Sequence, residues 1–257
     1  MTPTPRMVAD SLVERLGDGR QPVGFRYEAC VPDGALQTRT PGRGCVAPFI
    51  HAASKGRTVA FTPERCGWPC SAFYLGYSGW IFDGIERYLS TGPCPGRECE
   101  RFVRTPAQAR SHLESVRFRA PREAVAVFRP LAEFAPDGPP EVVIFFAAPD
   151  QLSALVLLLH FDAPEREDCI VARFASACAA MVTLPLAYVR DGVRKAVWGL
   201  HDISARVHLP RDVMTLALPW PFLLETCEHM EASFLYASPW EILRQRSLNS
   251  AKGVESC

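Results

Sequence analysis

Hydrophobic positions change their spacing several times along the chain, which predicts helices alternating with strands. The run Val142–Ala147 is continuously apolar and is typical of a strand buried on both faces. We expect other strands at 22–27, 58–61, 124–128, 169–174, 195–200 and 214–218. We expect helices at 8–16, 45–54, 71–75, 80–89, 106–116, 151–160, 177–186, 221–230 and 239–245. The predicted fold is α+β, a single domain with a mixed β-sheet and packed helices over residues 1–246, followed by a polar, disordered tail at 247–257.

Two stretches of the pattern resemble each other. Gly44-Cys45 opens an apolar helix that leads into the strand at 58–61, and Ala177-Cys178 opens an apolar helix that leads into the strand at 195–200. This suggests two similar halves, in which Cys45 and Cys178 would face one another at a shared cleft. Helix–turn–strand units also recur without duplication, so the sequence leaves both interpretations open.

Charge and hydropathy exclude some classes of partner. Lys and Arg together number 28, as do Asp and Glu, so the formal net charge is zero and no global field attracts nucleic acid. The longest apolar stretches, at 142–148 and 152–160, are far shorter than the roughly 20 residues of a membrane helix. Residues 1–20 are polar and charged, unlike a secretory leader. We expect a soluble, cytoplasmic protein without nucleic-acid or membrane partners, and the oligomeric state stays open.

The ten cysteines are the most informative residues. In a cytoplasmic chain, clustered thiols indicate metal, iron–sulfur or redox chemistry. Cys45 and Cys178 stand at predicted helix N-termini, where the helix dipole favours thiolate, and Cys66-Gly-Trp-Pro-Cys70 is a proline-containing turn. We predict that these four cysteines bind a metal, with a [4Fe–4S] cluster as the first choice and zinc as the second. The alternative is no cofactor, with the thiols packed as small hydrophobic groups.

The remaining cysteines give weaker signals. Cys94 and Cys99 flank Pro-Gly-Arg-Glu and suggest a second metal clip, a regulatory disulfide or, as the favoured interpretation, incidental thiols of an exposed loop. Four others lack partners by spacing and are expected to fill the core or lie in the tail: Cys30, Cys169, Cys227 and Cys257.

A polar cluster follows the predicted strand at 195–200. His201 could bind a metal or carry a proton, with Asp202 setting its tautomer, and Arg206 could hold a carboxylate or phosphate. Alternatively, Asp202 caps the next turn and Arg206 forms a surface ion pair. No phosphate-binding loop, dinucleotide fingerprint, HExxH or GxSxG motif occurs. Four aromatic residues near the Cys66–Cys70 turn could wall a ligand or belong to the core: Trp68, Tyr74, Tyr77 and Trp80.

Six segments stand out together: Gly44-Cys45-Val46-Ala47, 56–61, Leu75-Gly76-Tyr77, 141–146, Ser176-Ala177-Cys178 and 199–206. In their order and spacing they resemble a known family, called domain of unknown function 169 and also described as archaeal cysteine-rich. The resemblance covers roughly residues 10–240 and implies a fold and a set of cysteines rather than a reaction. Trp68-Pro69-Cys70-Ser71 stands where the family usually has a Cys-Pro-Gly-Gly-like turn.

The leading functional hypothesis is a cysteine-ligated metal or iron–sulfur protein with a redox or electron-transfer accessory role. A redox partner protein or small molecule would dock at the wall formed by His201, Asp202 and Arg206. The rival hypothesis is a small-molecule binding or sensor module that uses a cleft lined by His201, Arg206 and the aromatic residues, with structural cysteines. A thiol enzyme pairing Cys178 or Cys45 with His201 is a third, so the sequence does not decide whether the protein is an enzyme.

Overall fold

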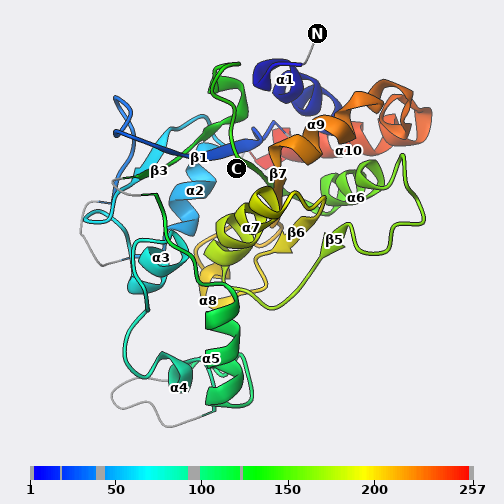
Figure 1. The fold of residues 1–257 in the computed structure, drawn as a ribbon. Coiled ribbons are helices and arrows are strands. Elements are labelled where there is room, and N and C mark those ends of the chain that lie inside the picture. The colour runs from blue at the N-terminus through cyan, green and yellow to red at the C-terminus, as the bar shows by residue number, and fades with distance from the viewer. Residues whose placement is uncertain (1–2, 18, 39–43, 92–98, 122–123, 255–257) are drawn as a thin grey trace.

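The computed structural model describes residues 3–17, 19–38, 44–91, 99–121 and 124–254, with 250–254 described by backbone only. Within these ranges, seven strands form one sheet in the order β2-β3-β1-β4-β7-β6-β5 (Figure 1). Neighbouring strands are antiparallel except β5 and β6, which are parallel, so the sheet is mixed and the α+β prediction is confirmed. The strands are β1 (Val23–Glu28), β2 (Val59–Phe61), β3 (Val125–Pro130), β4 (Val142–Ala147), β5 (Ile170–Val171), β6 (Ala196–Gly199) and β7 (Met214–Pro219).

Strand β4 lies at the centre of the sheet, between β1 and β7. All six of its residues are buried, as the continuous apolar run predicts. Its side chains alternate between two cores: Ile144 packs in one, and Val143 and Phe145 pack in the other. The period-2 geometry of a strand therefore gives the sheet an apolar surface on both faces.

Helices cover both faces (Figure 1). Residues of four helices build one core: α1 (Pro5–Leu16), α6 (Pro149–Leu159), α9 (Trp220–Glu228) and α10 (Ser238–Val254). The opposite core takes residues from α2 (Ala47–Ala53), α3 (Pro69–Tyr74), α5 (Pro106–Ser115) and α7 (Leu184–Asp191). Two single-turn helices, α4 (Ile85–Tyr88) and α8 (Ile203–Arg206), also contribute to this second core, through Ile85 and Ala205.

Some element boundaries differ from those expected. The predicted helix at 80–89 forms only α4, because Gly84 has φ of 86° and the helix starts after it. The strand expected at 169–174 contributes only two residues, at the edge of the sheet. The polar segment expected to be a disordered tail continues helix α10 as far as Val254, and 255–257 lie outside the described residues.

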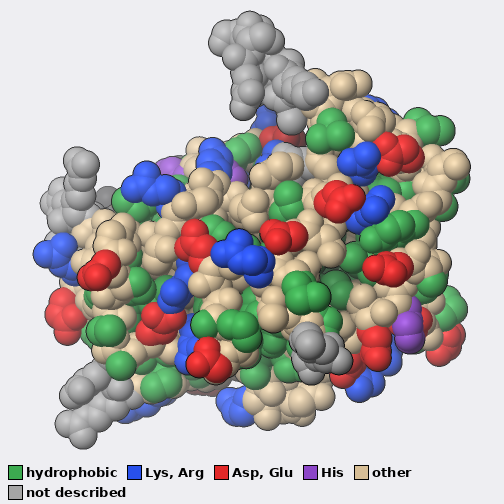
Figure 2. All heavy atoms as spheres, turned by 90° about the horizontal axis from the view of Figure 1, so that it is seen from above, with side chains coloured by type: hydrophobic (Ala, Val, Ile, Leu, Met, Phe, Trp, Pro, Cys, Tyr) green, Lys and Arg blue, Asp and Glu red, His purple; other side chains and the backbone are tan. Residues whose placement is uncertain are grey.

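Charged side chains of both signs are intermixed on the face shown in Figure 2, in keeping with the formal net charge of zero. Across the described part of the chain, every helix is too short or too polar to traverse a bilayer.

Candidate functional site

A pocket of about 250 Å³ lies on the face of the sheet covered by α3 and α7. Its lining comes from elements that are far apart in the sequence: α3, α4, α8, the segment around Glu100 and the segment that leads to Cys178. Three thiols and two carboxylates meet an otherwise largely apolar wall. The lining residues are Cys45, Trp68, Pro69, Cys70, Ser71, Tyr74, Ile81, Phe82, Ile85, Tyr88, Leu89, Glu100, Phe102, Phe174, Ser176, Ala177, Cys178, Asp202, Ser204, Ala205 and His208.

The Cys66–Cys70 turn packs directly on the segment that carries Cys45. The backbone N–H of Trp68 donates to the carbonyl oxygen of Gly44 at 3.1 Å. Gly67 permits this approach, because a Cβ there would lie 2.3 Å from the same oxygen. The glycine between the two cysteines therefore brings Cys70 and Cys45 to one pocket.

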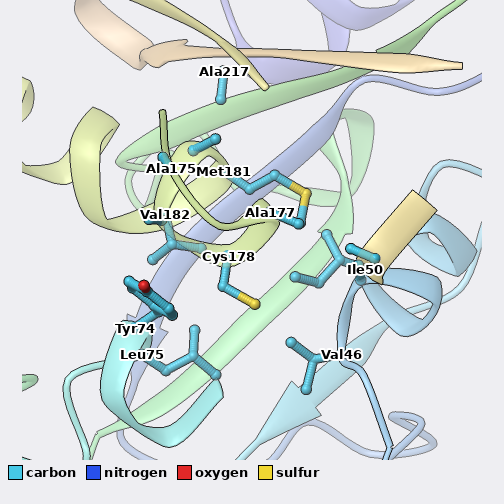
Figure 3. Packing of buried hydrophobic residues seen from close by; sticks show 14 of the residues in the cluster. Val46, Ile50, Tyr74, Leu75, Ala175, Ala177, Cys178, Met181, Val182 and Ala217 are labelled. Atoms are coloured by element: carbon cyan, nitrogen blue, oxygen red, sulfur yellow. The ribbon is translucent and has the colours of Figure 1, made fainter. Parts of the chain in front are cut away.

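Cys178 belongs to a helix that starts at Ala177 and contains a π-helical turn at Ala179–Thr183. The hydroxyl of Thr183 donates to the carbonyl oxygen of Tyr74 at 2.9 Å, which fixes this helix against α3. Figure 3 shows the Cys178 sulfur directed into the space between Tyr74–Leu75 and Val46–Ile50. Such π turns occur frequently at functional sites. Cys45 and Cys178 thus line one pocket, as the proposed two-half arrangement requires, although a relationship between the halves stays a prediction.

Asp202 fastens the Cys178 helix to α8. Its Oδ2 accepts the backbone N–H of Ala177 at 3.3 Å. Its Oδ1 accepts the N–H groups of Ser204 and Ala205, at 3.1 and 3.3 Å, and the Ser204 hydroxyl at 2.6 Å. The predicted capping role of Asp202 is confirmed, and the same carboxylate also lines the pocket.

The thiols of the pocket are held in their neutral form. Burial raises the pKa of Cys70 and of Cys66 to about 12, and it raises the pKa of Cys45. The pKa of Cys178 is raised well above its usual range, first by burial and then by the proximity of Cys45, Cys70 and Cys66. The negative charge of Asp202 raises the pKa of Cys178 further. The rise in thiol pKa caused by burial therefore outweighs the fall predicted from the helix N-termini.

The four cysteines singled out by sequence are thus neighbours, but they are not equivalent. Cys45, Cys70 and Cys178 line the pocket. Cys66 is 4% exposed and lies in the adjoining core, near enough to influence Cys178. Within the described ranges, no three His, Cys, Asp or Glu side chains are placed to hold a metal ion. The assignment of these cysteines as ligands stays a prediction.

Two of the three predicted polar residues lie outside the pocket lining. His201 is exposed, and its Nε2 lies 3.1 Å from the carbonyl oxygen of Trp198. The guanidinium of Arg206 donates to the carbonyl oxygens of Arg211 and Val213 and so fastens the following loop. Asp202 alone of the three lines the pocket, and a substrate-binding role for any of them stays untested.

Sequence reasoning missed Glu100, the second carboxylate of the pocket. Burial raises the pKa of this carboxyl, and the hydroxyls of Ser204 and Tyr88 are its hydrogen-bond partners. Glu100 lies in an irregular segment, so no periodic signal marks it. In the structure, backbone strain marks the pocket carboxylates instead. Arg101 and Leu200 have φ of 57° and 67°, and they are the two non-glycine residues of the described chain with positive φ. Each lies within two positions of a pocket carboxylate, and such strain is concentrated at functional sites.

Ser71 is a further polar group of the pocket. It is 1% exposed, and its hydroxyl has no hydrogen-bond partner apart from a weak contact with the thiol of Cys70. Of the predicted aromatic wall, Trp68 and Tyr74 line the pocket. The hydroxyl of Tyr77 instead donates to the carbonyl oxygen of Phe61 at 2.8 Å, in the core.

The other described cysteines are not among the residues that line the pocket. Cys99 is disulfide-bonded, and Cys94 and Cys257 lie outside the described residues. Cys169 is buried, with its sulfur 3.0 Å from Nε2 of His160. Cys30 is exposed and Cys227 is half-buried.

Comparison with known proteins gives a family and no activity. The family described as DUF169, "Uncharacterised ArCR", matches residues 11–229. No curated protein and no solved structure matches the chain.

Proposed function

Because the chain belongs to the DUF169 family, described only as uncharacterised, we propose its function from the pocket itself. We propose that the protein binds an iron–sulfur cluster through Cys45, Cys66, Cys70 and Cys178 and acts as a redox or electron-transfer accessory protein. The observation that carries this proposal is the meeting of thiols from three distant segments at one pocket. Packing alone does not require this, because small apolar side chains fill a core equally well.

Electrostatics support a positively charged occupant. The described lining contains Glu100 and Asp202 but neither Lys nor Arg. Buried thiolates in such a setting need a counter-charge, and burial accordingly raises the pKa of the thiols. Iron would supply that charge and displace the thiol protons, since a metal binds thiolate rather than thiol. A bound cluster would provide one-electron transfer at this site.

We favour a cluster over a single ion because, among the described residues, no three His, Cys, Asp or Glu side chains are placed to hold one metal ion. Zinc needs four ligand atoms around one ion, with each sulfur about 2.3 Å from it. In a four-iron cluster each thiolate binds a different iron, so the sulfurs need not meet at one point. Cys66, which lies behind the pocket wall, would be the fourth ligand. The role of the chain is to bring these sulfurs together and to exclude water with the surrounding aromatic side chains.

Anaerobic purification, followed by iron and acid-labile sulfide assays, tests the proposal. We expect iron, sulfide and a broad visible absorbance that bleaches on reduction. Cys45→Ser, Cys70→Ser and Cys178→Ser should each lose most of the iron, and Cys66→Ser should lose iron too. Cys227→Ser is the matched control, because its thiol has a pKa also raised to about 12 by burial but lies in the other core.

Far-UV circular dichroism of each variant tests whether it is folded. Equal iron in all five variants contradicts the ligand assignment. Stoichiometric zinc without colour indicates a structural ion instead of a cluster.

A second candidate is small-molecule binding with the cysteines as packing residues. The volume and the largely apolar lining favour it, because ligand pockets combine such walls with a few polar groups. Metal-free protein that keeps its fold and binds a small molecule equally well in the cysteine variants would support this candidate.

A further inference from the structure

The pocket has a second end that the thiols do not occupy. Cys178 lies close to Val182 and Tyr74, in the core that covers this face of the sheet (Figure 3). Helix α4, which contributes Ile85 and Tyr88, lies on the side away from the sheet (Figure 1). Aromatic and aliphatic side chains surround the space between these two ends.

The size of this space sets the size of an occupant. An apolar cavity of about 150 Å³ accommodates benzene. The present pocket, at about 250 Å³ including the thiol end, limits an occupant to at most a single ring with a short polar substituent. Phe82, Phe102 and Phe174 present ring edges or faces to such an occupant.

Glu100 is the polar group with capacity for a ligand. Both oxygens of Asp202 already accept hydrogen bonds from the protein. The single hydroxyl proton of Ser204 is directed to Asp202 at 2.6 Å, so it is not fully available to Glu100. An ionised carboxylate has about four acceptor positions, and Tyr88 and Ser204 cannot fill them.

The charge of the lining decides which ligand group Glu100 favours. His208 is the one basic side chain among the described lining residues. A cationic nitrogen would neutralise Glu100 and lie near the fixed charge of Asp202, whereas an anion would meet two like charges. The orphan hydroxyl of Ser71 provides a separate hydrogen-bonding position and is buried in the same pocket.

We infer that the pocket binds a small, ring-sized amine, with its ammonium group on the Glu100 carboxylate and its apolar body against the phenylalanine side chains. This inference goes beyond the cluster and stands or falls separately from it, since it depends on Glu100 rather than on the thiols.

Isothermal titration with three probes of similar size tests the inference on the full chain. The probes are benzylamine, which is cationic, benzyl alcohol, which is neutral, and phenylacetate, which is anionic. We expect benzylamine to bind about tenfold or more tightly than benzyl alcohol, the usual advantage of a charge-assisted hydrogen bond. Phenylacetate should bind most weakly.

Glu100→Gln should abolish the preference for the amine and leave the affinity for benzyl alcohol within about twofold. Glu165→Gln, which changes an exposed carboxylate outside the pocket, should preserve the preference. Equal binding of amine and alcohol by the unmodified protein, or an unchanged preference in Glu100→Gln, overturns the inference. The comparison of probes on the unmodified protein keeps the test valid if Glu100→Gln does not fold.

Iron content measured on the same samples separates the two proposals. Glu100→Gln should retain iron and lose the amine preference. Cys178→Ser should lose iron and retain the amine preference. Loss of both properties in both variants would overturn the inference, because the ligand would then depend on the cluster.

Discussion

Asp202 is a sensitive point of the site because one carboxylate holds the starts of two helices. Replacement by Ala removes acceptors for the N–H groups of Ala177, Ser204 and Ala205. Loss of the N-cap of α8 costs about 1 kcal/mol. The buried N–H of Ala177, left unpaired, adds about 1–2 kcal/mol. Asp202→Ala should therefore lower the free energy of unfolding by about 2–3 kcal/mol.

Asp202→Asn distinguishes the contribution of each carboxylate oxygen, since each oxygen serves a different helix. Its carbonyl oxygen can keep the contacts of Oδ1 with α8, but its NH₂ group then faces the N–H of Ala177, donor against donor. The expected loss is smaller, about 1–2 kcal/mol, and confined to the Cys178 helix. Amide hydrogen exchange should accelerate at 177–182 and stay unchanged at 203–206. Because the charge of Asp202 raises the pKa of Cys178, the Asn variant should also titrate its thiols at lower pH.

Urea unfolding at neutral pH measures the free energies. Asp168→Asn is a suitable control, since that exposed carboxylate forms a surface ion pair with Lys195 at 2.6 Å. If Asp202→Ala is within about 0.5 kcal/mol of the unmodified protein, the carboxylate does not hold the two helices together. Equal acceleration of exchange in both helices of Asp202→Asn would refute the division between its two oxygens.

Two further predictions concern pH and steric packing. Burial, with the nearby charges of Lys55 and Arg20, lowers the pKa of His51 from 6.5 to about 4. As the pH drops from 6.5 to about 4, the unfolded chain therefore binds a proton that the folded protein does not, and the free energy of unfolding falls. The His51 contribution reaches up to about 3 kcal/mol. His51→Phe should flatten the urea-unfolding profile over that interval, and an unchanged slope contradicts the assignment. Gly67→Ala should lower the free energy of unfolding by about 1–3 kcal/mol and lower the iron content. Gly79→Ala is the control and should change neither, because its Cβ would meet only the end of a flexible side chain at 3.2 Å. Equal effects of the two variants contradict the packing argument.

The sequence predicts the helices and strands of this protein better than the residues of its pocket. The run at β4 identifies a central strand because only a strand buried on both faces tolerates six consecutive apolar residues in this setting. The thiols at 45, 70 and 178 could be selected because each lies at a turn or helix start, where local signals are strong. The spatial order of β2, β3 and β1 leaves no comparable trace, since it depends on pairings between distant segments.

The remaining pocket residues were unpredictable for a related reason. Glu100, Phe102 and Phe174 come from irregular segments, where no periodicity indicates the direction of a side chain. His201 and Asp202 are adjacent in sequence, yet one lies on the exposed surface and the other in the pocket. Neighbouring residues of one motif therefore point in different directions, and the sequence alone does not show which of them faces the pocket.

The position of Cys178 follows from contacts that involve no ligand. Asp202 holds the start of its helix, Thr183 holds the next turn to Tyr74, and Gly199 of β6 admits the helix so closely that a Cβ there would lie 2.6 Å from Cβ of Ala180. These three restraints act on two turns of helix, so the thiol is positioned before anything binds. Preorganised groups lose little entropy when they meet their target. The three contacts act on the backbone and side chains around Cys178 and none uses its sulfur, so the thiol keeps its bonding capacity for an occupant of the pocket.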